Sequence, residues 1–500
     1  MTLLSITYGI FLFSILGIYW TREERSLRLG ILLVASLVFY GSLQIYYVPL
    51  LVAIALITYY MGLAIGQPAP LDWQISDAEW QFAQQDWNRR RWKLMWVGIV
   101  LNIALLLLFK YVPFLLTTTG ELFRLPQAQS GADWISQSLI APLGLSYFVF
   151  ECMAYLIDVY RGEPASSSLL AFTTYKLFFP KLLSGPITRF HYLENQLKEL
   201  RSPRLDQVIE GLWLIACGAV KKLLLADHLA TYVNLSFANI ERAGSGDLWL
   251  TTFAYGFQLY LDFGGYVDVA RGSATLLGFE IPPNFDFPYM TTSIADFWRR
   301  WHMTLGSWLR NYLYFPLGGS RRGLARTCIN LIVVMVIAGI WHNPGWGFVI
   351  WGAIHGVTLA IHRLAEQVGR RSPHWKPFWA GIPGTLLAWG ITHLTVFFSW
   401  IFFRLPEPQD FGLVMRRLVG QTADVQFAQR IYVETLQISR GQLTLLLCGL
   451  VVAMAGLYWI RRGAKLQLNW PVKSFLIPVL LYLAWLLAPS ESLPYIYFDF

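Results

Sequence analysis

Apolar residues run through this chain in stretches about as long as a membrane-spanning helix, and short polar segments separate them. A helix that crosses a bilayer needs ~20 mostly apolar residues. The clearest stretches cover residues 4–20, 29–66, 95–116, 135–158, 248–278, 378–403, 443–459 and 475–487. Charged residues or prolines interrupt further stretches. The pattern predicts an all-α polytopic membrane protein with about ten or eleven transmembrane or re-entrant helices in a single integral-membrane domain over residues 1–500.

Basic residues between the apolar stretches indicate the orientation of the chain. No Lys or Arg precedes the first stretch, whereas Arg22, Arg25 and Arg28 follow it, and residues 461–473 are basic as well. Short cytoplasmic loops carry an excess of Lys and Arg. We therefore expect a multi-pass protein of the inner (plasma) membrane with its N-terminus and C-terminus outside.

The first sizeable polar segment, residues 67–93, combines aromatic and basic residues. Tryptophans recur at seven-residue steps (Trp73, Trp80, Trp87), and a basic run follows at residues 89–93. Seven-residue spacing places the tryptophans along one face of a helix. The segment predicts an interfacial helix or loop on the cytoplasmic side. A docking surface for a partner is the alternative.

Two histidines, His302 and His342, each follow a tryptophan within residues 296–351. Around the first, the apolar positions 298, 301, 305, 308 and 312 alternate steps of three and four. That spacing predicts one amphipathic helix. Asp296 lies three and four residues before Arg299 and Arg300, so it can pair with either of them.

The second histidine ends a run that is too short to cross a bilayer. Residues 329–341 number only 13. If Arg326 lies near the membrane surface, His342 lies about 24 Å deeper at ~1.5 Å per residue, within a hydrocarbon core ~30 Å thick. Asn343, Pro344 and Gly345 then break the helix. Because basic residues flank both ends, we expect residues 326–363 to form a hairpin with His342 near its tip.

Ionisable side chains at membrane depth are costly and usually face a cavity or a partner. His342 on a broken backbone therefore indicates the wall of an internal chamber, although a structural histidine bonded to a nearby carbonyl remains the alternative. Gln258 and Asp262 lie four residues apart in an apolar stretch, which predicts a helix facing a wet interior. Glu151, an acid in another apolar stretch, should also face the interior.

Composition supports the membrane class and narrows the partners. The chain is 55% hydrophobic and 14% charged, whereas soluble domains average ~25% charged residues. The net charge of +9 comes from short loops between apolar stretches, so we expect contact with membrane lipid and no nucleic-acid partner. The four cysteines are scattered, without a spacing that suits a metal, and we expect no metal site.

A buried histidine suits acid–base chemistry near neutral pH. In an acyl transfer, one histidine would take the proton of the attacking hydroxyl, and the other would orient the substrate or stabilise developing negative charge. The sequence contains no GxSxG, Walker A or HExxH motif that would indicate other chemistry.

Six stretches resemble the membrane-bound O-acyltransferases, in particular the bacterial branch with alginate O-acetyltransferase and the D-alanyl transferase of teichoic acids. The resemblance runs in family order over residues 142–356, and its ending YLYFPLGG is more similar to the alginate-acetylating branch. The matching stretches are PLGLSYFVFECMAYLIDVYRG (142–162), FPKLLSGPITRF (179–190), AVKKLLLADHLA (219–230), FQLYLDFGGYVDVARGSATLLGFEIPPNFDFPY (257–289), DFWRRWHMTLGSWLRNYLYFPLGG (296–319) and GIWHNPGWGFVIWGAIHG (339–356).

The resemblance implies a shell of helices around a tunnel that crosses the membrane. An acyl thioester, either acetyl-CoA or an acyl-carrier protein, would enter from the cytoplasm as a co-substrate, with no permanently bound cofactor. His342 corresponds to the family's catalytic histidine and His302 to its second functional histidine. His355 matches the WGxxHG pattern, where a supporting role and simple packing both stay open. We expect the substrate-binding or tunnel-lining residues to include Trp301, Trp341, Asn343, His355, Arg299, Arg300, Asp296, Asp262 and Gln258.

The leading hypothesis is transfer of a short acyl group, with acetyl expected, onto a hydroxyl of an exported polysaccharide or of an extracytoplasmic partner protein. D-alanyl transfer to a cell-wall polymer is one alternative, and a structural scaffold is another. A proton-coupled transporter also uses buried ionisable groups, but the inverted repeats of many transporters are not found in this sequence. One departure from the family is Asn343–Pro344, where glycine commonly follows the histidine.

Overall fold

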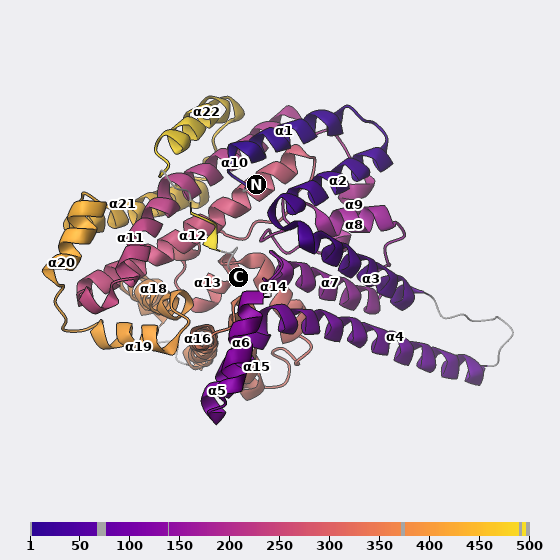
Figure 1. The fold of residues 1–500 in the computed structure, drawn as a ribbon, viewed down its shortest axis with the longest axis horizontal. Helices are drawn as coiled ribbons and strands as arrows, with labels where there is room; N and C mark the ends of the chain where they lie inside the picture. The colour runs from indigo at the N-terminus through magenta and orange to yellow at the C-terminus, as the bar shows by residue number, and fades with distance from the viewer. Residues whose placement is uncertain (1–2, 68–76, 139, 372–375, 490–492, 497–500) are drawn as a thin grey trace. The chain divides into compact units, whose positions relative to one another are not determined.

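The computed structural model describes residues 3–67, 77–138, 140–371, 376–489 and 493–496. Within these ranges the regular structure is entirely helical and contains no strand, which confirms the all-α class (Figure 1). The chain divides into two compact units, residues 1–211 with 270–282 and residues 212–269 with 283–499. The prediction of a single integral-membrane domain is not tested by this division.

The first unit is built from the helices that precede residue 211. Its apolar helices pack closely where glycines face large side chains. A Cβ atom on Gly62 would collide with the Tyr155 ring, and one on Gly98 with Leu156, so α3 and α4 both approach α7 closely (Figure 1). The helices are α1 (Ile6–Trp20), α2 (Arg25–Gln44), α3 (Val48–Gly66), α4 (Asp77–Leu106), α5 (Val112–Phe123), α6 (Pro126–Ser138), α7 (Leu145–Tyr160), α8 (Leu169–Leu177), α9 (Phe190–Lys198) and the start of α10 (Leu205–Ala219).

Glu151 on α7 organises the interior of this unit. Its carboxylate accepts hydrogen bonds from Lys181 Nζ at 2.6 Å, from Lys176 Nζ at 3.3 Å, and from the backbone N and Oγ1 of Thr188 at 3.0 Å each. All four side chains are buried. The prediction that Glu151 faces the interior is therefore confirmed. Its partners fix the non-helical chain after α8, which ends at Leu177.

The polar segment before α4 is only partly described. Residues 77–93 are not a separate helix but the first turns of α4, and Trp73 lies outside the described residues. Arg91 donates to carbonyl oxygens of Ile65, Val159 and Tyr160 at 2.7–3.2 Å, which lie at the C-terminal ends of α3 and α7. A cation is favourable there because the orphan carbonyls carry partial negative charge. The interfacial location of residues 67–93 stays a prediction.

The second unit holds the predicted hairpin and the candidate site. Glycines again allow close approach, because a Cβ atom on Gly339 would collide with the Phe348 carbonyl and one on Gly352 with the Met335 carbonyl. The hairpin of α15 and α16, with its break between His342 and Trp346, is confirmed. The helices are the end of α10, α11 (Asp227–Phe237), most of α12 (Ser245–Leu276), α13 (Ile294–Arg300), α14 (Met303–Leu309), α15 (Leu324–His342), α16 (Trp346–Arg371), α17 (Lys376–Ala380), α18 (Ile382–Arg404), α19 (Pro408–Arg417), α20 (Val425–Ala428), α21 (Arg440–Tyr458) and α22 (Trp470–Leu486).

Six helical segments among the described residues are long and apolar enough to cross a membrane, which supports a multi-pass membrane protein. Two shorter apolar helices, α1 and α22, match the first and last predicted stretches. The predicted count of ten or eleven and the predicted tunnel stay predictions. The six segments are Arg25–Gly66, Gln84–Phe123, Leu324–His342, Trp346–Gly369, Ile382–Arg404 and Arg440–Gly463.

Candidate active site

His302 lies at a break between two short helices. The prediction of one continuous amphipathic helix over residues 298–312 is wrong, because α13 ends at Arg300 and α14 begins at Met303. His302 has φ 42° and ψ 54°, the left-handed conformation, which ends one helix and turns the chain into the next. A residue other than glycine is uncommon there, and such conformations cluster at functional sites.

The loop at residues 284–286 stabilises this break. Asn284 accepts the Met303 backbone N–H on its carbonyl at 3.0 Å, and its side-chain oxygen accepts from the N–H and hydroxyl of Thr304 at 3.2 and 2.6 Å. The backbone N–H of Asp286 donates to the Arg300 carbonyl at 3.1 Å. These bonds replace those that a continuous helix would have made, so the left-handed turn is supported from outside its own segment.

His342 is the last residue of α15 and lies inside an aromatic cluster. Its ring centroid is 5.3 Å from that of Trp351 on α16 and 5.1 Å from that of Phe403 on α18, and the residue is buried. Asn343 follows in an extended conformation with φ −160°, which ends the helix at the histidine. The sequence predicted this break, whereas the depth of His342 in the membrane stays a prediction.

The structure brings the two histidines together. Their ring centroids lie 6.3 Å apart, and the Trp341 ring is 6.3 Å from His302 and 5.0 Å from His342. Phe263 on α12 contacts the other side of His302 at 4.9 Å. His302 lies outside the six candidate spans, and burial lowers its pKa to about 3. Its imidazole is therefore neutral near pH 7.

His355 on α16 is fully engaged in hydrogen bonds. Trp298 Nε1 donates to His355 Nδ1 at 3.2 Å, and His355 Nε2 lies 2.9 Å from Ser399 Oγ. Because the Ser399 hydroxyl donates to the Val396 carbonyl at 2.7 Å, the proton of the imidazole is on Nε2. Both ring nitrogens are occupied, which favours a structural role that holds Trp298 and α18 over a chemical one.

The charged candidates on α13 lie at the margin of this cluster. Asp296 forms ion pairs with Arg299 at 3.4 Å and with Arg300 at 3.1 Å, which confirms the predicted pairing. The side chain of Arg299 is 68% exposed, in contrast to the buried histidines. Trp301 is buried beside them, with its ring centroid 5.1 Å from that of Trp400.

The two candidates on α12 differ in their surroundings. Asp262 forms a buried ion pair with Lys222 at 2.7 Å, and Lys222 also pairs with Asp227 at 2.8 Å. This cluster was not predicted, because in the sequence Lys222 only interrupts an apolar stretch and Asp227 only ends it. Gln258 is buried as well, and its side-chain oxygen has no hydrogen-bond partner among the described residues.

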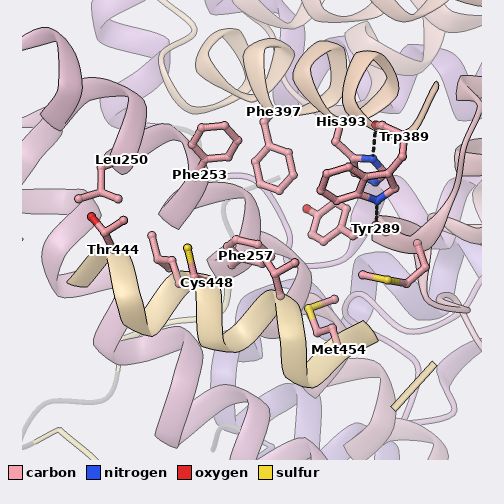
Figure 2. A pocket seen from close by; sticks show the side chains of 13 residues that line it. Leu250, Phe253, Phe257, Tyr289, Trp389, His393, Phe397, Thr444, Cys448 and Met454 are labelled. Carbon is pink, nitrogen blue, oxygen red and sulfur yellow. Dashed lines mark hydrogen bonds between the residues drawn. The ribbon is translucent and has the colours of Figure 1, made fainter. Parts of the chain in front are cut away.

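A separate apolar cavity of about 210 Å³ lies between α12, α18 and α21 (Figure 2). Trp389 and His393 lie at one end, where Trp389 Nε1 donates to the Tyr289 carbonyl at 3.0 Å. Tyr289 also lines the cavity and stacks on Trp301 at 5.9 Å between ring centroids. The residues that line this cavity do not include His302 or His342, so it is not the predicted tunnel.

Several residues around the histidines were not singled out from the sequence. Trp351 and His355 share one face of α16, so the helical spacing offered a signal for Trp351. No sequence pattern indicated Asn284 or Ser399, because their contacts are with segments that are distant in the sequence.

The sequence is similar to known proteins over most of its length. The model of the membrane-bound O-acyltransferase family matches residues 90–399, which include both histidines. A probable alginate O-acetylase of Pseudomonas putida is 33% identical, and the match covers 98% of each chain. A peptidoglycan O-acetyltransferase of Helicobacter pylori is 33% identical over 78% of this chain and 73% of the relative.

A more distant relative is a teichoic acid D-alanyltransferase of Bacillus subtilis, which is 27% identical over 54% of this chain and 70% of its own length. The family model spans more than half of the chain, and the two acetyltransferases match over most of it. The chain therefore belongs to the membrane-bound O-acyltransferase family.

Proposed function

We propose that this O-acyltransferase moves a short acyl group, acetyl, from a cytoplasmic thioester onto a hydroxyl of an exported cell-surface polymer. The observation that carries the proposal is the pair of buried imidazole rings, 6.3 Å apart, at two helix breaks inside the matched region. Two imidazoles in a buried site provide the groups that transfer between a thioester and an alcohol requires.

In this mechanism His342 is the general base. Its imidazole takes the proton of the acceptor hydroxyl while that oxygen forms a bond to the acyl carbonyl carbon. The carbon–sulfur bond then breaks, and the proton passes from His342 to the departing thiolate. His302 is suited to a different task, because a group whose pKa is about 3 is a weak base at neutral pH. We assign it to orienting the substrate and stabilising the negative charge on the carbonyl oxygen.

The nature of the acceptor follows from what the relatives share. Their names give alginate, peptidoglycan and teichoic acid as the polymers on which they act. All three are polymers outside the cytoplasm, which supports an exported glycan as the acceptor, reached directly or through an extracytoplasmic protein. The two acetyltransferases cover 98% and 78% of this chain, and the alanyltransferase covers 54%. This difference supports acetyl over D-alanyl.

The donor and the location complete the proposal. The donor is acetyl-CoA or an acyl-carrier protein that approaches from the cytoplasm, and no cofactor stays bound. The proposed location is the inner (plasma) membrane with both termini outside. Arg22, Arg25 and Arg28 after the first apolar helix support an outside N-terminus, and the basic residues 461–473 support an outside C-terminus. Arg299, with its exposed side chain near the site, is available to an anionic donor.

The test is the ester-linked acyl content of cell-surface glycans, measured by mass spectrometry after mild base release. Cells with the native chain are compared with cells that carry His342→Ala at equal membrane abundance. Loss of one acyl species supports the proposal and identifies the acyl group together with its acceptor. Identical profiles would contradict it, and a proton-coupled flux in reconstituted vesicles that is lost in His342→Ala would then favour a transporter.

A further inference from the structure

A short segment, Leu493–Ile496, is bound beside α12 by its main chain. The Pro494 carbonyl accepts a hydrogen bond from Lys222 Nζ at 3.2 Å, and the Ile496 backbone N–H donates to Asp262 Oδ2 at 2.9 Å. Tyr495 between them is 3% exposed, and its ring packs edge-on against Tyr266 with centroids 5.1 Å apart. Lys222 Nζ also lies 4.6 Å from the centre of the Tyr495 ring.

The two side chains that hold the segment are themselves joined. One oxygen of Asp262 pairs with Lys222 at 2.7 Å while the other accepts from Ile496, so a single carboxylate bridges the lysine and the segment. Asp227 pairs with the same ammonium at 2.8 Å. All three side chains are at most 4% exposed. Buried charges are costly, so the use of two of them, Lys222 and Asp262, to hold the main chain of this segment indicates a requirement for its placement.

Close packing of glycines explains how Lys222 reaches Asp262. A Cβ atom on Gly218 would lie 2.7 Å from the Gly265 carbonyl, and one on Gly265 would lie 2.9 Å from the Gly218 carbonyl. Residues Val220–Ala226 then form a π-helical turn, η3, in the chain that continues from α10. Single π-helical turns are frequent at functional sites, because they redirect side chains.

The bound segment and His302 contact neighbouring parts of α12. Phe263 contacts the His302 ring at 4.9 Å, and Tyr266, three residues later, contacts Tyr495 at 5.1 Å. Residues three apart on a helix are neighbours on its surface. The face of α12 that supports His302 is therefore continuous with the face that the segment covers.

We infer that Lys222 and Asp262 are positioning residues, which hold Leu493–Ile496 against α12 beside His302, and that acyl transfer requires the segment in this place. The inference rests on the proposed function. The bound segment holds in place the stretch of α12 that contacts His302. It also shields that stretch of α12 from water. Exclusion of water matters because a thioester beside a general base can be hydrolysed instead of transferred.

The test combines an accessibility measurement with an activity measurement. Tyr495→Cys, at a position where the native side chain is 3% exposed, is introduced into the full chain with the four native cysteines replaced by alanine, and its reaction with N-ethylmaleimide is followed in native membranes. We expect slow labelling in this background and labelling faster by about tenfold or more when Lys222→Met is added. The matched control is Lys221→Met, which breaks the adjacent Lys221–Asp268 ion pair (2.5 Å). The control should leave the labelling rate unchanged.

Transfer is measured per mole of folded protein without the Tyr495→Cys substitution. We expect kcat to fall about tenfold or more in Lys222→Met, with the KM for the thioester within about twofold, and Lys222→Arg to restore part of the rate. Asp262→Asn is the second variant if Lys222→Met does not accumulate. Faster labelling with undiminished transfer, or unchanged labelling, would overturn the inference. If the native chain transfers nothing, the proposed function fails, whereas the labelling still reports whether the two residues hold the segment.

Discussion

His302 and His342 lie with their ring centroids 6.3 Å apart, His302 at the break between α13 and α14 and His342 at the end of α15. The two breaks have different causes. Asn343, Pro344 and Gly345 follow His342 directly, whereas the turn at His302 is stabilised by contacts from Asn284 and Asp286. Both histidines are buried and contact aromatic rings, Trp341 beside His302 and Trp351 beside His342.

The first prediction compares the loss of transfer in His342→Ala with the loss in Asp296→Ala, which changes a charged residue at the margin of the aromatic cluster. His342→Ala should abolish transfer, because removal of a general base costs ~10²–10⁴-fold, while the protein stays folded and inserted. Asp296→Ala should cost less than tenfold, because Asp296 only pairs with Arg299 and Arg300. Both are measured as acyl transfer per mole of folded protein. An Asp296→Ala defect as large as that of His342→Ala would show that the roles are assigned wrongly.

The second prediction distinguishes the effect of the left-handed backbone conformation of His302 on stability from the effect of its imidazole on transfer. Glycine adopts positive φ without steric cost, whereas a β-branched residue does not. His302→Gly should therefore keep thermal stability close to native and still lose most transfer. His302→Val should lose transfer and also stability, by about 1–2 kcal/mol relative to His302→Gly. Equal melting temperatures for the two variants would mean that the left-handed turn at residue 302 is not maintained in solution.

The third prediction concerns His355. Its Nδ1 accepts from Trp298 and its Nε2 donates to Ser399, so His355→Ala removes the acceptor of the Trp298 indole N–H and one of the two hydrogen bonds of the buried Ser399 hydroxyl. We expect a loss of about 1–3 kcal/mol in stability, with most of the transfer rate per folded molecule retained. Thermal unfolding in detergent and a transfer assay at low temperature measure the two effects. A native melting temperature together with abolished transfer would instead give His355 a direct chemical role.

Sequence reasoning succeeded where the structural cause is local. The end of α15 at His342 was predictable because Asn343, Pro344 and Gly345 stop a helix by their own chemistry. The hairpin followed from the basic residues at both of its ends. The pairing of Asp296 with Arg299 and Arg300 followed from helical spacing alone.

Sequence reasoning failed where the cause lies in distant segments. The three-and-four spacing around His302 is that of a continuous helix, and only the bonds from residues 284–286 show why the helix breaks. Lys222 and Asp262 are 40 residues apart, and the lysine appears in the sequence as an interruption of an apolar stretch. Periodicity carries no information on which distant residue satisfies a buried charge.

The fourth prediction tests the close approach of α15 and α16. A Cβ atom on Gly352 would collide with the Met335 carbonyl, and backbone cannot move aside as a flexible side chain does. Gly352→Ala should therefore destabilise the protein by about 1–3 kcal/mol. The control is Gly449→Ala on α21, where nothing lies within 4 Å of the new methyl group. There alanine should be neutral or stabilising by up to about 1 kcal/mol, because glycine is the poorer helix former. Equal unfolding temperatures for both variants would contradict the packing of the hairpin.

The fifth prediction concerns the carboxylate of Glu151, which holds two buried lysines. Glu151→Gln preserves the size of the side chain but removes the charge, and Lys176 and Lys181 then face each other without a counter-ion. Breaking a buried ion pair on one side costs about 3–5 kcal/mol, so we expect a large fall in folded protein, measured by size-exclusion chromatography in detergent and by thermal unfolding. The exposed pair Arg204–Asp206 is the control, and Asp206→Asn should change neither measurement. Adding Lys181→Met to Glu151→Gln should recover part of the loss, because it removes one uncompensated charge from the interior. A double variant no more stable than Glu151→Gln would show that the uncompensated charge is not the cause, and that Glu151 acts through its hydrogen bonds to Thr188.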